Sequence, residues 1–283
     1  MSRTEVKELT RQLRRNPGND GGQRILVAGK GGVGKTTLTA ALCLLGAADG
    51  RRVLAVDQDA QQNLAYSLGY PPEKAALLRP ITQELDYVEE KVGARPGSGW
   101  GGIIGLNPDV SDVAERFGVR IRDNLHLLVM GGVVQASTGC LCPENSLLGA
   151  LVRFLNSRED DLIVMDAQAG LEPFGRTVAE GFGNTLVVSE PTFNSLQVAA
   201  RIEKLSRELG MNRVDLVLNR CQGKADRDKV RRYIPEASFD RVHELPWDHL
   251  VLEHEPDLSP IVGSKGAYVD GVRALYRSLD GRS

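Results

Sequence analysis

The chain has 283 residues, of which 41% are hydrophobic and 25% charged, and its formal net charge is −2. These values are typical of a globular protein with a large core, and the near-neutral charge gives no electrostatic reason to expect binding to nucleic acid or to an anionic membrane. No apolar run approaches the roughly 20 residues that span a bilayer, the N-terminus is charged, and four cysteines do not make a disulfide scaffold. We therefore expect a cytoplasmic protein with reduced thiols.

The first 22 residues precede the first expected core strand. Val6, Leu9 and Leu13 recur at helical spacing, and the stretch 16–22 is rich in Gly and Asn. The pattern predicts an N-terminal extension made of a short amphipathic helix and a flexible linker.

A glycine-rich loop, residues 29–37 (GKGGVGKTT), follows an apolar strand at 25–28 and precedes an apolar helix at 37–45. It matches the phosphate-binding pattern G-x-x-x-x-G-K-[ST]. Glycines let successive N–H groups point at an anion, and the helix N-terminus adds a favourable dipole. Lys35 supplies positive charge for the β- and γ-phosphates, and the Thr36 hydroxyl can bind Mg²⁺. The loop predicts a site for ATP and Mg²⁺.

Two acidic residues follow the next expected strand, residues 53–56. Asp57 and Asp59 stand one strand–helix unit beyond the phosphate-binding loop. One carboxylate there can orient the attacking water while the other braces the Mg²⁺ shell.

The region 71–124 is less regular. Pro71 and Pro72 interrupt it, the stretches 82–92 and 110–117 look helical, and 93–102 is rich in glycine. We interpret it as an insertion on one face of the sheet. A strand is expected at 125–130.

Cys140 and Cys142 lie in the segment 139–146 (GCLCPENS). In an extended segment, side chains at i and i+2 point the same way, with Cα atoms about 6.6 Å apart. Two thiolates so placed suit one soft metal ion, and a two-fold dimer would bring two pairs together as four ligands. Pro143 would end this strand and Ser146 would begin a helix to about Leu155. The alternative from the residues alone is a pair of buried structural cysteines.

The apolar stretch 161–166 ends in Asp166, which is the Walker B pattern. Its carboxylate can hold Mg²⁺ through water. Gly170 follows closely, where a glycine lets a backbone amide approach the γ-phosphate.

Two late strands, 185–189 and 214–218, complete the expected sheet, and the second runs into Asn219 and Arg220. A side-chain amide such as that of Asn219 can read both a donor and an acceptor on a base edge. A loop at 245–248, which contains Pro246, and a helix at 268–279 that packs on the sheet follow.

Lys30, just after the first loop glycine, makes the loop resemble the deviant Walker A loop of the MinD/ParA/nitrogenase-iron-protein class. That resemblance implies a dimeric ATPase in which Lys30 reaches the partner's nucleotide and acts in catalysis with Lys35. It implies that Asp59 orients the water, that Asp57 supports it, and that Asn219 and the backbone near Pro246 bind adenine. The implied nucleotide-binding residues are Gly29, Lys30, Gly31, Gly32, Val33, Gly34, Lys35, Thr36, Thr37, Gly170, Asn219, Arg220 and Pro246.

From about residue 25 to 276 the chain resembles the CooC-type ATPases that help to insert nickel into carbon monoxide dehydrogenase. The most specific feature is the Cys140-x-Cys142 pair followed by Glu144 and Asn145. The resemblance implies an ATP-hydrolysing homodimer, a nickel chaperone that binds Ni²⁺ or Zn²⁺ between two CxC pairs. Cys140 and Cys142 would be its ligands, and a nickel enzyme would be its client.

This sequence departs from that family at two points. Pro173 stands where His is common, and Ala60 follows Asp59 where Pro is common, so the client is left open between carbon monoxide dehydrogenase and a related nickel enzyme. Two alternative functions are compatible with the same phosphate-binding loop. One is a MinD/ParA-type positional ATPase without metal function, and the other is an iron-protein-like reductase with a [4Fe–4S] cluster.

The alternation of strands and helices predicts an α/β fold, a mostly parallel, doubly wound sheet with helices on both faces. Because Asn219 comes late in the chain, we expect the residues of the nucleotide site to be drawn from most of the length of the chain. The prediction is one P-loop NTPase domain over residues 23–283, with the insertion at 71–124 and the cysteine segment at 139–146, and no nucleic-acid or membrane partner.

Overall fold

The computed structural model describes residues 22–59, 61–95, 108–131, 142–157, 162–169, 182–235 and 238–279. Within them, one eight-stranded sheet has the order β3-β4-β2-β5-β1-β6-β7-β8. All neighbouring strands are parallel except β3 and β4, which are antiparallel. The strands are β1 (Gln23–Gly29), β2 (Val53–Asp57), β3 (Val119–Arg122), β4 (Leu125–Val129), β5 (Leu162–Asp166), β6 (Asn184–Ser189), β7 (Arg213–Cys221) and β8 (Val242–Pro246).

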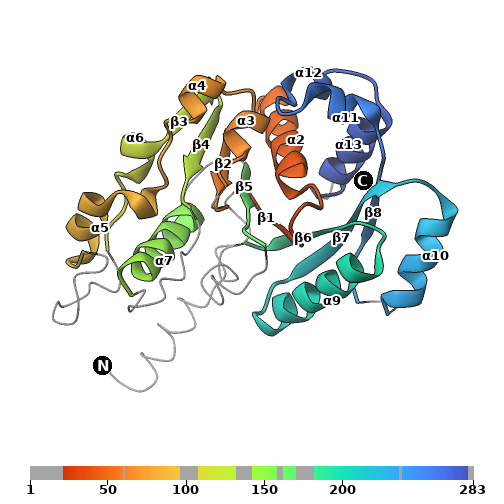
Figure 1. Ribbon diagram of the computed structural model, residues 1–283. Helices are drawn as coiled ribbons and strands as arrows, with labels where there is room; N and C mark the ends of the chain where they lie inside the picture. The colour runs from red at the N-terminus through yellow and green to blue at the C-terminus, as the bar shows by residue number, and fades with distance from the viewer. Residues whose placement is uncertain are drawn as a thin grey trace.

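Helices cover both faces of this sheet (Figure 1). They are α2 (Lys35–Ala48), α3 (Leu64–Ser67), α4 (Pro72–Ala75), α5 (Leu85–Val92), α6 (Val113–Phe117), α7 (Cys142–Ser157), α9 (Phe193–Glu208), α10 (Lys224–Tyr233), α11 (His249–His254), α12 (Ser259–Val262) and α13 (Ala267–Leu279), with a 3-10 turn η1 (Ile81–Gln83). One hydrophobic cluster joins the sheet to α2, α3, α12 and α13, and the other joins it to α5, α7 and α9.

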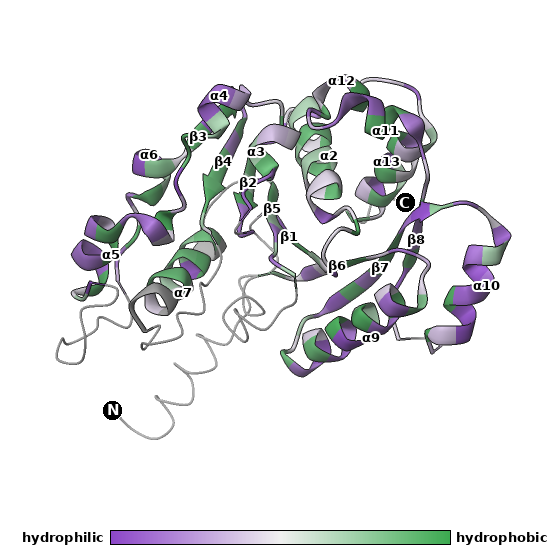
Figure 2. Ribbon diagram, viewed as in Figure 1, coloured by the Kyte–Doolittle hydropathy of each residue, from purple (hydrophilic) through white to green (hydrophobic). Residues whose placement is uncertain are grey.

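The central strands are apolar on both faces because helices bury both sides of a parallel sheet. Strands β2 and β5 are buried along their whole length, and the hydropathy colouring of Figure 2 shows the apolar residues gathered on the strands and on α2. The single-domain α/β fold with a mostly parallel sheet is thus confirmed.

Strand β3 lies in the stretch for which the sequence predicted only helices and loops. Its residues alternate between half-buried Val119 and Ile121 and exposed Arg120 and Arg122. Arginines on an edge strand discourage further strand pairing, so this short strand closes one side of the sheet.

The expected strand over the cysteine segment is wrong at Cys142, because helix α7 begins at that residue, four positions earlier than predicted. Pro143 therefore lies in the first turn of a helix and does not end a strand. Proline is favourable there, since its missing N–H has no partner to lose in a first turn and its φ is already helical.

Several sequence predictions fall outside the described residues. These are the N-terminal extension up to residue 21, most of the glycine-rich stretch 93–102, Cys140 and Gly170. Within the described part, no helix is both long and apolar enough to cross a membrane.

Candidate nucleotide site

The site residues described by the structure gather at the carboxyl edge of the sheet. Strand β1 ends in Gly29, and its neighbour β5 ends in Asp166, which pairs in register with Asp57 at the end of β2. Strand β7 brings Asn219 to the same edge. This is the edge at which open α/β sheets bind their ligands.

The loop between β1 and α2 needs glycine at specific positions. Gly34 has φ +94°, and a Cβ there would overlap the side-chain nitrogen of Asn219. A Cβ at Gly29 would overlap the carbonyl oxygen of Val188. The backbone at these points is therefore closely surrounded, and only glycine lets the loop curl against β6 and β7.

The two lysines of the loop are placed differently. Lys35 begins α2, is buried, and donates from Nζ to the carbonyl oxygen of Lys30 at 3.2 Å. Lys30 itself is exposed. Lys35 thus belongs to the cradle formed by the loop and the N-terminus of α2, whereas Lys30 is available to a molecule outside it.

Thr36 and Asp166 form a close oxygen pair. The Thr36 hydroxyl donates to Oδ2 of Asp166 at 2.6 Å, and Oδ1 of Asp166 is buried with no hydrogen-bond partner among the described residues. Burial raises the pKa of Asp166 to about 7, although Thr36 and Lys35 act in the opposite direction. A hydroxyl, a carboxylate and an unpartnered carboxylate oxygen fit a hard divalent cation such as Mg²⁺, which would also favour the ionised carboxylate.

Asp57 and Asp59 have distinct surroundings. Asp57 is fully buried and accepts hydrogen bonds from the backbone N–H groups of Asp59 at 3.0 Å and Leu64 at 3.1 Å. Burial and the neighbouring Asp166 raise the pKa of Asp57 to about 8. Asp59 is half-buried and accepts from the backbone of Gln61. Asp57 therefore shapes the turn after β2, and the charge of Asp59 contributes to the raised pKa of Asp166.

Asn219 and Arg220 tie the end of β7 to the phosphate-binding loop. The Asn219 amide donates to the carbonyl oxygen of Val33 at 2.8 Å and accepts from the backbone N–H of Arg220 at 3.0 Å. The Arg220 guanidinium donates to the carbonyl oxygen of Gly32 at 3.3 Å and forms an ion pair with Glu190. Both residues therefore hold the loop in place.

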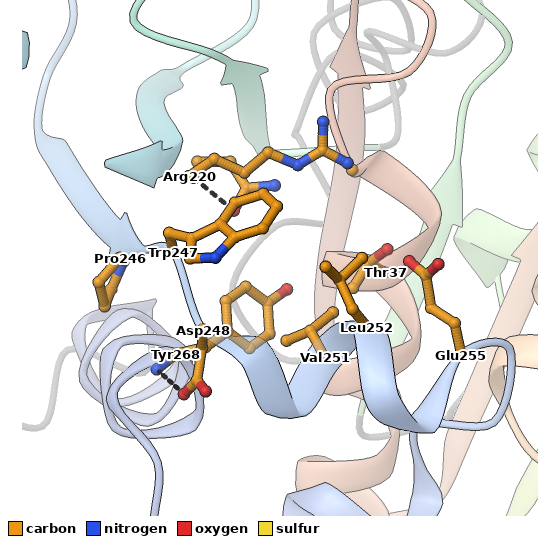
Figure 3. Close-up of a pocket in the computed structure, with 11 residues that line it drawn as sticks. Thr37, Arg220, Pro246, Trp247, Asp248, Val251, Leu252, Glu255 and Tyr268 are labelled. Atoms are coloured by element: carbon orange, nitrogen blue, oxygen red, sulfur yellow. Dashed lines mark hydrogen bonds between the residues drawn. The ribbon is translucent and has the colours of Figure 1, made fainter. Parts of the chain in front are cut away.

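A pocket opens beside this junction, between the loop, the end of β8 and helices α11 and α13 (Figure 3). Its lining residues are Gly34, Thr37, Asn219, Arg220, Pro246, Trp247, Asp248, Val251, Leu252, Glu255 and Tyr268. The predicted residues Thr37, Asn219, Arg220 and Pro246 thus share one pocket. Trp247 lies in the loop predicted at 245–248, and Tyr268 begins the helix predicted at 268–279, but the sequence singled out neither side chain as part of a pocket.

Both carboxylate oxygens of Asp248 accept hydrogen bonds from backbone N–H groups of the protein itself. Its Oδ1 accepts from the backbone N–H of Leu250 and caps α11, and its Oδ2 accepts from the backbone N–H of Tyr268. These two bonds, both 3.1 Å long, join the loop after β8 to the first turn of α13.

Gln58 is a further residue that the sequence did not single out. It lies between the two aspartates, is fully buried, and neither polar atom of its side chain has a hydrogen-bond partner within the ranges that the structure describes. No pattern signals it, because the middle position of Asp-x-Asp carries no motif.

The cysteine pair cannot be placed as a site. Cys140 lies outside the described residues, and of Cys142 the structure gives only its position at the start of α7. Among the residues that are described, no group of three or more His, Cys, Asp or Glu side chains could hold a metal ion.

The fold and this edge define a nucleotide-binding α/β protein with a phosphate-binding loop. Residues 25–258 match the profile of the CobQ/CobB/MinD/ParA nucleotide binding domain family. The chain is 35% identical to the carbon monoxide dehydrogenase accessory protein CooC of Rhodospirillum rubrum, over 86% of this chain and 92% of that protein. It is 34% identical to an ATP-binding protein of Methanocaldococcus jannaschii, over 82% of this chain and 88% of that protein.

The solved structure of the MinD cell division protein of Aquifex aeolicus superposes with a TM-score of 0.64 at 21% identity, covering 92% of this chain and 98% of that one. The structure of MinD from Pyrococcus horikoshii, solved in complex with Mg-ADP, superposes with a TM-score of 0.61 at 21% identity, covering 91% of this chain and 96% of that one. The chain belongs to the CobQ/CobB/MinD/ParA nucleotide-binding domain family and is an ATPase of that family.

Proposed function

We propose that this ATPase is a nickel-insertion accessory protein for carbon monoxide dehydrogenase or a related nickel enzyme. The observation that carries the proposal is the 35% identity to the CooC accessory protein along nearly the whole of both chains, together with the cysteine pair at 140 and 142. The metal is the cargo, the protein acts as a cytoplasmic homodimer, and ATP regulates how firmly the dimer holds the metal.

The other two cysteines support the assignment of the cargo site to this pair. Burial raises the pKa of the Cys43 thiol well above its usual range. Burial, with Glu244 and Asp226 nearby, raises the pKa of Cys221 to about 11. Only a thiolate ligates a metal well, so Cys43 and Cys221 are poor ligands at neutral pH. Cys140 and Cys142 remain as the candidate thiolates among the four cysteines of the chain.

In the proposed mechanism the loop backbone and Lys35 bind the phosphates of ATP. Thr36 and Asp166 would hold the Mg²⁺ ion, which neutralises phosphate charge during hydrolysis. Asp59 orients the attacking water, and Asp57 keeps the turn that carries Asp59 in shape. Lys30, exposed at the start of the loop, reaches the nucleotide of the partner subunit, so that ATP draws two copies together.

The test is equilibrium dialysis with Ni²⁺ and with Zn²⁺, with and without ATP, while light scattering follows the mass of the particle. Wild type is compared with the double variant Cys140→Ala/Cys142→Ala, and Cys221→Ala is the matched control. We expect one metal ion per two chains, lost in the double variant and kept in the control, together with dimer formation.

If no metal binds through Cys140 and Cys142 while ATP still drives dimerisation, the MinD/ParA-type positional ATPase is favoured and the proposal is contradicted. A brown protein with visible absorption would favour the [4Fe–4S] reductase instead.

A further inference from the structure

The pocket beside the phosphate-binding loop is lined in part by apolar and aromatic side chains. Its walls include Trp247 and Leu252, each 44% exposed, together with Pro246 and Val251. Apolar and aromatic groups of this kind favour a flat ring system, on which an indole can stack. Gly34 and Thr37 belong both to the pocket and to the loop, so a ligand whose phosphates lie on the loop would place its remainder here.

Three polar side chains of the pocket, those of Asn219, Arg220 and Asp248, already have hydrogen-bond partners. Both carboxylate oxygens of Asp248 accept backbone N–H groups. The Asn219 amide uses one N–H on Val33 and its oxygen on the N–H of Arg220, which leaves it one N–H and one lone pair. Asn219 can therefore make part of a base contact, but it cannot supply the whole of it while it holds the loop.

Tyr268 differs from these three side chains. The residue is 3% exposed, and its hydroxyl is buried without a hydrogen-bond partner among the residues that the structure describes. Figure 3 shows the ring reaching from α13 into the pocket, with the hydroxyl directed toward the space between Trp247 and Leu252. A buried hydroxyl without a partner is unfavourable, and a ligand that bonds to it removes this penalty.

We propose that Tyr268 is a nucleobase-binding residue whose hydroxyl hydrogen-bonds to an edge of the adenine ring, while Trp247 covers the ring face. The inference rests on the proposed nucleotide site and is independent of the metal and of the client enzyme. A hydroxyl both donates and accepts, so it can bind either a ring nitrogen or the exocyclic amine.

The first test compares Tyr268→Phe with Tyr276→Phe. Tyr276 lies on the same helix and is also buried, but its hydroxyl accepts a hydrogen bond from Arg51, away from the pocket. Titration calorimetry measures Mg²⁺-ADP and inorganic tripolyphosphate, which has no base. We expect Tyr268→Phe to weaken ADP binding about five- to tenfold, the size of one neutral hydrogen bond, and to leave tripolyphosphate binding unchanged. Tyr276→Phe should bind both like wild type.

Thermal melting separates this role from a structural one. Because the Tyr268 hydroxyl has no partner in the described part of the chain, its removal should leave the melting temperature unchanged or raise it slightly. A lower melting temperature for Tyr268→Phe would show that the hydroxyl has a structural role and would overturn the assignment.

The second test identifies the atom on the base. The diphosphates of 1-deaza-, 3-deaza- and 7-deazaadenosine and of purine riboside each lack one group that a hydroxyl could bind. One of the four should bind equally to wild type and to Tyr268→Phe, because its contact is already lost. If ADP binds both proteins equally, or if all four analogues keep the same ratio between them, the inference is wrong. Wild type that binds neither ADP nor tripolyphosphate would instead overturn the nucleotide site itself.

Discussion

At the scale of single residues, the site depends on side chains that meet across large sequence distances. Thr36 and Asp166 are 130 positions apart and share a hydrogen bond of 2.6 Å. The bond orients one carboxylate oxygen and leaves the other free for a cation. A carboxylate so deeply buried would be costly without these partners, so the pair serves the fold before any nucleotide binds.

Replacement of Thr36 by Val keeps the shape of the side chain and removes only the hydroxyl. We expect Thr36→Val to destabilise the protein by about 1–3 kcal/mol, since the Asp166 carboxylate loses its partner. We also expect Mg²⁺ no longer to strengthen ATP binding. Urea unfolding and calorimetry with and without Mg²⁺ measure the two effects.

Thr36→Ser is the control, because it keeps the hydroxyl and should keep the Mg²⁺ effect. If Thr36→Val responds to Mg²⁺ as wild type does, the Thr36–Asp166 pair is not the cation site.

At the scale of elements, Asp215 joins two strands and a helix at the end of the sheet opposite the nucleotide site. It is fully buried on β7 and binds the guanidinium of Arg213 at 2.6 Å and Nε2 of His243, on β8, at 3.2 Å. Arg213 also donates to the carbonyl oxygen of Ser278 in α13. The network holds β7, β8 and α13 together.

The network predicts loss of stability in acid. Burial acts to raise the pKa of Asp215, but the hydrogen bonds and charges of His243 and Arg213 outweigh it and hold the pKa below its ordinary value of 3.8. A folded-state pKa below the unfolded value stabilises the protein above about pH 4, and the contribution is lost as the pH falls through the folded-state pKa.

Asp215→Asn should therefore cost about 3 kcal/mol at pH 7, because the Arg213 charge loses its partner, and the difference from wild type should shrink below pH 4. Urea unfolding at pH 7, 5 and 3.5 measures it. A difference that stays constant down to pH 3.5 would contradict the assignment.

Most of the strands that carry the candidate site could be predicted from the sequence. The apolar runs before Gly29, Asp57, Asp166 and Asn219 place these residues at one edge, because carboxyl ends of parallel strands meet there. Strand β3 could not be predicted in this way, because its four residues alternate with arginines and form no apolar run. Pro143 misleads because proline both ends strands and begins helices.

The role proposed for Tyr268 also could not be predicted from the sequence. The sequence places it only at the start of the predicted helix, next to the apolar stripe that includes Val269, Val272 and Leu275, and in the structure Tyr268 packs in the same core cluster as that stripe. Only the packing of α13 against the loop after β8 shows that its hydroxyl enters a pocket. Binding residues that lie within a core stripe carry no separate pattern.

At the scale of the whole molecule, the phosphate-binding loop and the first residue of α7 belong to helices on opposite faces of the sheet. The loop at the end of β1 starts α2, and Cys142 starts α7 on the other face of the sheet. If ATP and metal both favour the dimer, each must strengthen the binding of the other by the same factor, since coupling free energies are reciprocal.

We therefore expect a non-hydrolysable ATP analogue to tighten Ni²⁺ binding by a factor of about 5–150, and Ni²⁺ to tighten binding of the analogue by that same factor. Lys30→Ala should reduce the factor toward one, because the exposed Lys30 makes the proposed contact between one subunit and the nucleotide of its partner. Competition dialysis for Ni²⁺ and calorimetry for the analogue supply the two measurements on each protein. A factor near one in wild type would mean that the two sites act independently. An undiminished factor in Lys30→Ala would mean that the coupling passes through the sheet within one subunit and not across the dimer.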